Sequence, residues 1–207
     1  KVFVDNTNKN VGVVTDITST ITTGQFNTAV GTPTMLNITE GTGNSAFGDA
    51  SLINNNTGDA NSAYGRWSLG NNSSGSGNTA VGENALKTNT TGDNNTALGK
   101  DADVASNNLS NATALGANAE VSQSNSLVLG NNVNVGIGTS SPSEILNINT
   151  TAGQHDAIVK IQAESSSSES RVEFWKWVDQ YGVLQYGSGV GFYPGDANLK
   201  LRTTGSV

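Results

Sequence analysis

Apolar positions return along much of the chain with a fixed period of 17 residues. In each unit an alanine is followed by a larger apolar residue and a glycine, as in Ala46-Phe47-Gly48 and Ala63-Tyr64-Gly65. A second apolar position lies four residues after the glycine and is occupied by Met35, Leu52, Leu69 and Leu86, then one residue later by Val104 and Val121. Self-similarity at a fixed period of this length is the signature of a repeat architecture.

Glycine and asparagine mark the same unit, which reads Gly-x-x-Asn-[Thr/Ser]-Ala-apolar-Gly. The main glycine column is Gly31, Gly48, Gly65, Gly82, Gly99, Gly116 and, after a last and shorter unit, Gly130. A second column holds Gly24, Gly41, Gly58, Gly75 and Gly92, and the asparagine column holds Asn27, Asn44, Asn61, Asn78 and Asn95. Glycine permits positive φ angles and asparagine tolerates them, so the columns predict tight turns.

A unit of 17 residues is too short for two helices and a loop, and it has few good helix formers. It fits two short strands and two turns, which form one coil of an all-β parallel β-solenoid. About seven coils, each about 4.8 Å from the next, would extend roughly 30 Å. One coil buries too little apolar surface, at about 25 cal/mol per Å², to offset the cost of ordering it. Packing against identical chains is therefore expected to supply the remaining stabilisation.

The pattern divides the chain into four segments. Residues 1–23 are expected to form an N-terminal strand segment, with a strand from Val2 to Val4, and residues 24–133 the repeat domain. Residues 134–143 read as a glycine-punctuated connector that ends at a proline. Residues 144–207 show short alternating strands, beginning with Ile145 to Asn149, and predict a small β-rich module.

The units Asn-Thr-Ala-Val-Gly, Asn-Ser-Ala-Phe-Gly and Asn-Thr-Ala-Leu-Gly resemble the head repeats of trimeric autotransporter adhesins. This resemblance implies a left-handed parallel β-roll and a homotrimer. The stretch from Asn134 to Pro142 resembles a unit of modular bacteriophage tail fibres. The familiar head repeat is shorter than most units of this chain, so the longer coils here should carry an enlarged turn.

Composition narrows the functional classes. The chain of 207 residues has a net charge of −7, no cysteine and one histidine. Nucleic-acid backbones need clustered basic residues, and zinc sites need several cysteines or histidines, so neither ligand is expected. No apolar run reaches the roughly 18 residues of a membrane span. We expect no catalytic residues, metal or cofactor, and the Asp59, Asp93 and Asp101–Asp103 carboxylates read as turn residues rather than calcium ligands.

Aromatic side chains gather near the C-terminus and are the candidates for contact with a receptor or glycan: Trp175, Trp177, Tyr181, Tyr186 and Tyr193. Such rings can stack on sugars, although packing within the sheet or a trimer is the favoured interpretation. A flat Thr/Ser column could also order ice, but ordinary solvated hydroxyls explain it better.

The favoured function is a structural trimeric fibre segment of a phage tail or other extracellular virion appendage, which works with other fibre modules and supports host-surface attachment. The alternative is the head of a bacterial cell-surface adhesin. A carbohydrate-binding module is the weakest of the three hypotheses.

Overall fold

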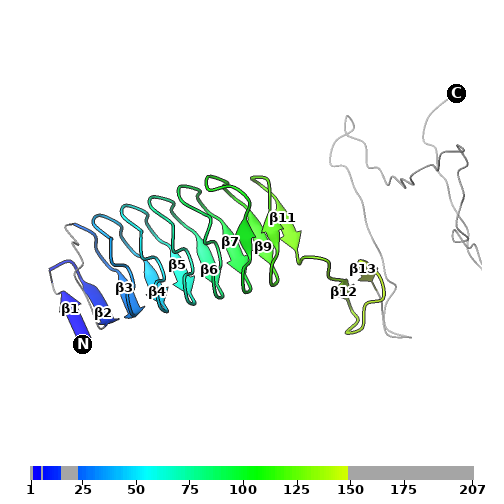
Figure 1. The fold of residues 1–207 in the computed structure, drawn as a ribbon, viewed down its shortest axis with the longest axis horizontal. Coiled ribbons are helices and arrows are strands. Elements are labelled where there is room, and N and C mark those ends of the chain that lie inside the picture. The colour runs from blue at the N-terminus through cyan, green and yellow to red at the C-terminus, as the bar shows by residue number, and fades with distance from the viewer. Residues whose placement is uncertain (1, 6, 15–22, 149–207) are drawn as a thin grey trace, which may run out of the picture. The chain divides into compact units, whose positions relative to one another are not determined.

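The computed structural model describes residues 2–5, 7–14 and 23–148. This part of the chain is an all-β parallel β-solenoid of about six turns without helices (Figure 1). The predicted fold class is therefore confirmed at this level. Between the strands Thr28–Gly31 and Leu127–Leu129 the chain makes six complete turns, where about seven coils were predicted, and the strand Asn10–Val14 stacks before them.

The strands are short and evenly spaced. They are β1 (Val2–Asp5), β2 (Asn10–Val14), β3 (Thr28–Gly31), β4 (Ser45–Phe47), β5 (Ser62–Tyr64), β6 (Thr79–Val81), β7 (Thr96–Leu98), β8 (Asp103–Val104), β9 (Thr113–Leu115), β10 (Glu120–Val121), β11 (Leu127–Leu129), β12 (Val135–Ile137) and β13 (Leu146–Ile148). We call the stacked turns from β2 to β11 the roll.

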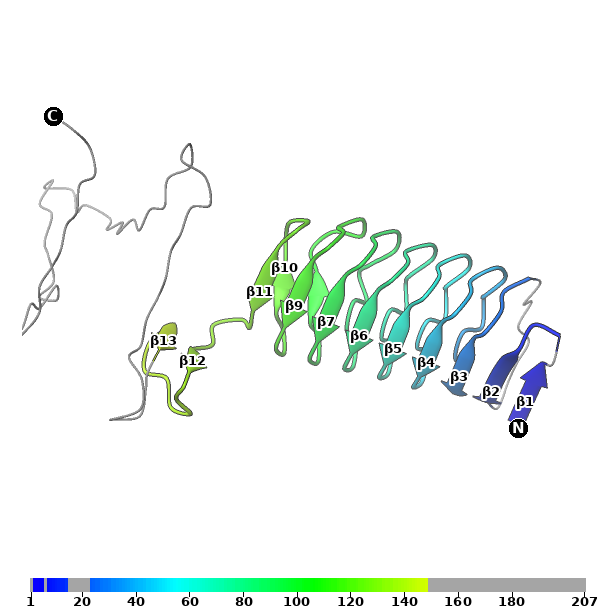
Figure 2. The same ribbon diagram turned by 180° about the vertical axis from the view of Figure 1, so that it is seen from behind.

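One sheet runs the length of the roll, in the order β1-β2-β3-β4-β5-β6-β7-β9-β11. From β2 onward the strands pair parallel and in register, so that each residue lies beside its equivalent in the next turn, as Ala46 lies beside Ala63. Figure 2 shows this regular stack from behind. The strand predicted at Val2 to Val4 is confirmed as β1, which pairs antiparallel with β2 at the N-terminal edge.

The core of the roll is narrow. The alanine at the centre of strands β3 to β7 and β9 points inward, and Ala46, Ala63, Ala80 and Ala97 are fully buried. They belong to the same core cluster as the second apolar column, in which Leu52, Leu69 and Leu86 are also fully buried. The larger apolar residue after each alanine faces outward instead, and Leu98, for example, is 47% exposed. An interior this thin accepts alanine on the sheet side and one leucine opposite.

The one-residue displacement of the second apolar column has a backbone cause. Met35, Leu52, Leu69 and Leu86 have positive φ angles between 47° and 50°. A residue branched at Cβ is strongly disfavoured there. Val104 and Val121, which occupy the displaced positions, lie instead in the extended strands β8 and β10, which pair with each other. The branched side chain therefore reaches the core from a strand rather than from a left-handed turn.

The roll includes a strand that precedes the obvious repeats. Val11-Gly12-Val13 of β2 pairs with Thr28-Ala29-Val30 of β3, and Asn10 occupies the asparagine position of this turn. Farther along the chain, β12 and β13 form a separate two-stranded parallel sheet, which contains the expected strand near Ile145. The other strands predicted for the C-terminal module, from residue 157 onward, lie outside the described residues.

Candidate functional site

The regular spacing of asparagine in the repeats corresponds to a buried ladder of hydrogen bonds. In each turn the asparagine Oδ1 accepts the backbone N–H of the next asparagine, as from Asn61 to Asn44 and from Asn78 to Asn61, each 2.9 Å. Its Nδ2 donates to the carbonyl at the end of its own turn, as from Asn61 to Gly75 at 2.8 Å. The full ladder contains Asn10, Asn27, Asn44, Asn61, Asn78 and Asn95, and its last acceptor receives the N–H of Ala112.

This ladder corrects the physical reason that sequence reasoning assigned to asparagine. Asn27, Asn44, Asn61, Asn78 and Asn95 are buried, and none has a positive φ. They suit these positions because one amide side chain supplies both the acceptor and the donor that two buried backbone groups need. The ladder ends at Ala112, where the following turn, from β9 to β11, is shorter than the preceding ones.

A second, shorter asparagine ladder runs beside part of the second glycine column. Asn72 donates to Oδ1 of Asn55 at 2.8 Å, and Asn89 donates to Oδ1 of Asn72 at 2.9 Å. Each also bonds the glycine carbonyl three residues ahead, as Asn72 does with Gly75. A Cβ on Gly75 would lie 2.4 Å from the carbonyl oxygen of Gly92 in the next turn and 2.5 Å from Oδ1 of Asn72 in its own turn. This glycine column therefore reflects close approach between turns and not, as predicted, a positive φ.

The main glycine column has the predicted conformation. Gly31, Gly48, Gly65, Gly82, Gly99 and Gly116 have φ angles between 117° and 142°, and Gly130 has 68°. Space is limited as well, because a Cβ on Gly65 would lie 2.4 Å from the carbonyl oxygen of Gly82. Both constraints arise at the corner where the chain leaves the sheet.

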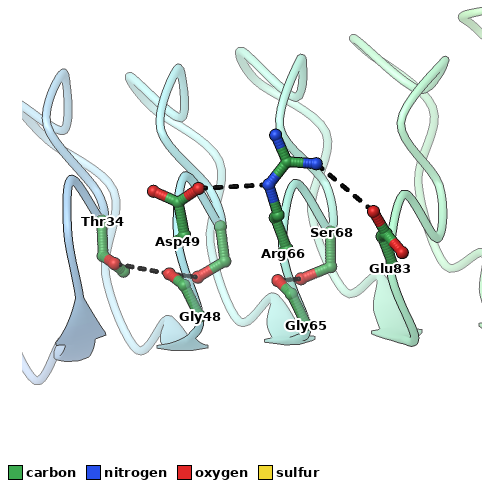
Figure 3. Close-up of polar contacts among 8 residues, drawn as sticks. Thr34, Gly48, Asp49, Gly65, Arg66, Ser68 and Glu83 are labelled. Atoms are coloured by element: carbon green, nitrogen blue, oxygen red, sulfur yellow. Dashed lines mark hydrogen bonds and ion pairs between the residues drawn. The ribbon is translucent and has the colours of Figure 1, made fainter.

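Charged side chains of alternating sign line one exposed edge of the roll. Arg66 lies 3.3 Å from Asp49 on one side and 3.3 Å from Glu83 on the other (Figure 3). Lys100 lies 3.6 Å from Glu83. In the same corner, Thr34 and Ser68 donate hydrogen bonds to glycine carbonyls (Figure 3). Exposed ion pairs contribute little stability individually. The alternation does keep like charges from meeting in adjacent turns.

The carboxylates considered as calcium ligands serve as hydrogen-bond acceptors. Asp59 accepts the N–H of Thr42 at 2.7 Å, and Asp93 accepts the N–H of Ser76 at 2.7 Å. Asp101 accepts a hydrogen bond from the side-chain amide of Asn84. Within the described ranges, no group of three or more His, Cys, Asp or Glu is arranged to hold a metal ion.

Asp103 is a half-buried acidic residue at the start of β8. Burial raises the pKa of its carboxyl, and the nearby Glu120, its partner in the β8–β10 register, adds to the increase. Hydrogen bonds from Thr88 and from the Val104 backbone act in the opposite direction. Desolvation is the largest of these effects, so folding shifts the carboxyl of Asp103 toward its protonated form.

The outer face of the long sheet carries an uninterrupted apolar column. Its members, in register from turn to turn, are Val13, Val30, Phe47, Tyr64, Val81, Leu98, Leu115 and Leu129, which we call the outer column. Phe47 and Tyr64 stack with ring centroids 5.0 Å apart and planes 4° apart. Because this stack follows the strand-to-strand direction, the ring faces meet neighbouring turns, and ring edges point outward.

The aromatic residues singled out for receptor contact, Trp175, Trp177, Tyr181, Tyr186 and Tyr193, lie outside the described residues. Trp67 of the roll, by contrast, is placed. Its ring packs against the backbone of Gly70, where an added Cβ would be 2.6 Å from the ring. The Lys87 ammonium lies 5.5 Å from the ring centroid. Trp67 thus packs against its own turn at Gly70 and contacts the next turn through Lys87.

Sequence reasoning identified the positions of the repeat residues but missed the outer column as a surface. The signal was the Thr-Ala-apolar triplet itself, in which the first and third residues share a face. No helix capable of crossing a membrane occurs in the part of the chain that the structure describes. Comparisons with known proteins identify no relative: no family model matches the chain, and no curated protein or solved structure gives a significant match.

Proposed function

We propose that the chain is a segment of a homotrimeric structural fibre, displayed outside the cell on a phage tail or similar virion appendage, where it supports attachment to a host surface. The observation that carries the proposal is the outer column. A sheet that faces water on one side normally alternates apolar inward and polar outward positions. Here an apolar side chain faces outward in every strand of the long sheet from β2 to β11.

The energetics of the outer column favour association with further copies. Tyr64, Val81, Leu98, Leu115 and Leu129 retain between 37% and 47% of their exposure in the single chain. Burying the remainder would contribute about 1 kcal/mol for each side chain. Copies in parallel and in register would present the same column to one another at every turn. The left hand of the roll and the number three come from the resemblance to adhesin heads.

The interior of the roll supports a mechanical role. Successive turns are joined by backbone hydrogen bonds and, as far as Ala112, also by the buried asparagine ladder. A rod of this kind keeps its length and holds its ends apart. A rod formed by three copies would present three identical surfaces to a repetitive host surface. Such multivalent attachment strengthens binding without any new contact.

A bacterial cell-surface adhesin head is the second candidate, favoured by the Asn-Thr-Ala-Val-Gly type of repeat. Immunogold labelling separates the two candidates. Antibodies against this chain should mark virion fibres if the first proposal holds, and label confined to bacterial cell surfaces would replace it with the second.

The oligomer is tested by sedimentation equilibrium of the whole chain. The expected mass is three times the chain mass of 21.2 kDa. Leu98→Asp, which places a charge in the outer column, should yield folded monomers, whereas Thr91→Asp, on an exposed turn, should leave the trimer intact. Circular dichroism serves to check that both variants are folded. A wild-type chain that sediments as a folded monomer would refute the proposal, and a trimeric Leu98→Asp variant would exclude the outer column as the interface.

A further inference from the structure

The two-stranded sheet that follows the roll is unusually small for a parallel pair. β12 and β13 pair from Val135↔Leu146 to Ile137↔Ile148, and only residues 138–145 connect them. Parallel strands ordinarily need a connection of a dozen or more residues. The short return is held by the Val135 N–H, which donates to the Ile145 carbonyl at 2.8 Å, and by Asn134 Nδ2, which donates to the Pro142 carbonyl at 3.1 Å. We call residues 133–148 the connector pair.

The connector pair leaves its large apolar side chains exposed. Val133 is 51% exposed, Ile137 54%, Ile145 81% and Leu146 58%. A two-stranded sheet is marginally stable on its own, and three or more strands or a covering element are normally needed. The connector pair therefore requires further apolar surface from outside residues 133–148.

The surrounding sequence has the charge distribution of an interface. No charged residue occurs between Glu120 and Glu144, a run that includes β11 and β12. Depletion of charged residues distinguishes the core of a protein interface from ordinary surface, which usually carries both signs. Val133 and Ile137 of the connector pair lie within this uncharged run, and Glu144, which precedes Ile145 and Leu146, is the one charged residue of the pair.

The short chain between the two sheets is the observation that favours a second copy as the partner. β11, whose Leu129 ends the outer column, is separated from β12 by residues 130–134. These residues span at most about 20 Å when fully extended. If copies associate through the outer column, these short linkers hold their connector pairs close together. The effective concentration of one connector pair near another then reaches the millimolar range. The connector pair of a second copy offers the same exposed apolar side chains and is already held nearby.

We propose that the connector pair is a second contact between copies of this chain, in which the apolar side chains of residues 133–148 from different copies pack together. This inference rests on the proposed function, because the outer column provides the tether. It adds a separate site of association, with its own residues and its own test.

A cysteine introduced into the connector pair tests this contact directly, because the chain has no native cysteine. Ile137→Cys should form disulfide-linked dimers under mild oxidation, seen on a non-reducing gel. We expect the rate to be at least tenfold higher than for Thr57→Cys, which places the same thiol on an exposed turn of the roll. Equal rates for the two variants would overturn the inference.

Sedimentation of the same samples before oxidation distinguishes the two proposals. A trimer in which Ile137→Cys does not cross-link faster than the control leaves the proposed function intact and refutes only the connector contact. That result would also follow if other residues of the same copy covered Ile137. A monomeric wild-type chain refutes both.

Discussion

The asparagine ladder predicts a pH-dependent defect when one of its members is changed to aspartate. In Asn61 the side-chain Nδ2 donates to the Gly75 carbonyl at 2.8 Å, while Oδ1 accepts the N–H of Asn78 at 2.9 Å. Asn61→Asp keeps the size and the acceptor. It replaces the donor with an oxygen that faces another oxygen, in a position with no solvent exposure.

The magnitude follows from the burial of an unpaired charge. An uncompensated buried charge destabilises a protein by about 3–5 kcal/mol. Asn61→Ala, which leaves the Asn78 N–H without its acceptor but introduces no charge, should cost about 1–3 kcal/mol. In the Asn61→Asp variant, burial raises the pKa of the introduced carboxyl in the folded chain above its unfolded value. Protonation then restores a donor toward Gly75, so stability should rise as the pH falls through the folded-state pKa.

Urea denaturation followed by circular dichroism, at one fixed protein concentration and a series of pH values, measures both effects. Asn71→Asp is the matched control, because Asn71 is exposed, and its stability should follow the wild type. At neutral pH the free energy of unfolding should decrease from wild type to Asn61→Ala to Asn61→Asp. In acid, the aspartate variant should regain the most stability. An Asn61→Asp variant as stable as Asn71→Asp, or one without recovery in acid, would refute the role assigned to the ladder.

Two further substitutions test the backbone and the titrating residue. Leu69→Val places a Cβ-branched residue at a φ of 50° and should lower the free energy of unfolding by about 2–3 kcal/mol, whereas Leu98→Val in an extended strand should cost about 1 kcal/mol or less. Equal losses of urea stability in these two variants would argue against the backbone explanation. The pKa of Asp103 is raised in the folded state, so the folded chain binds a proton there more readily than the unfolded chain. Asp103→Asn should therefore raise the free energy of unfolding at neutral pH and reduce the increase in that free energy that the wild type shows as the pH falls. If the pH dependence of the urea midpoint is the same in variant and wild type, Asp103 does not contribute to it.

Much of the fold could be predicted from the sequence because the constraints are local and recur at a fixed period. A glycine with a positive φ at each corner where the chain leaves the sheet, near 135° from Gly48 to Gly99, leaves little choice of residue, so the main glycine column is visible without a structure. The strand from Val2 to Val4 and the first strand of each repeat were equally accessible, since short apolar runs lie between turn residues. The second strand predicted for each coil forms, among the described residues, only at β8 and β10, because the second apolar residue of the earlier turns lies in a left-handed turn. The constant spacing of the units then implies that equivalent positions stack.

The sequence could not decide which side chains face inward. A strand such as Thr79-Ala80-Val81 is short, and its alternation is equally consistent with the alanine inside or with its two neighbours inside. Packing decides, because the interior is too narrow for Phe47 or Tyr64 and accepts only alanine opposite the leucine column. Because alanine fills the inward positions, the larger apolar residues of the outer column are left on the exposed face of the sheet.

The function of asparagine in the repeats also depended on the tertiary structure. Asparagine is compatible with left-handed turns and with buried amide ladders, and its sequence spacing is the same in both cases. Only the stacked turns show that the amide bridges two buried backbone groups. The amino-acid sequence by itself therefore determined the repeat, its strands and its main corners, which follow from local sterics. The directions of the side chains, the ladder and the exposed apolar column were decided by how closely successive turns approach.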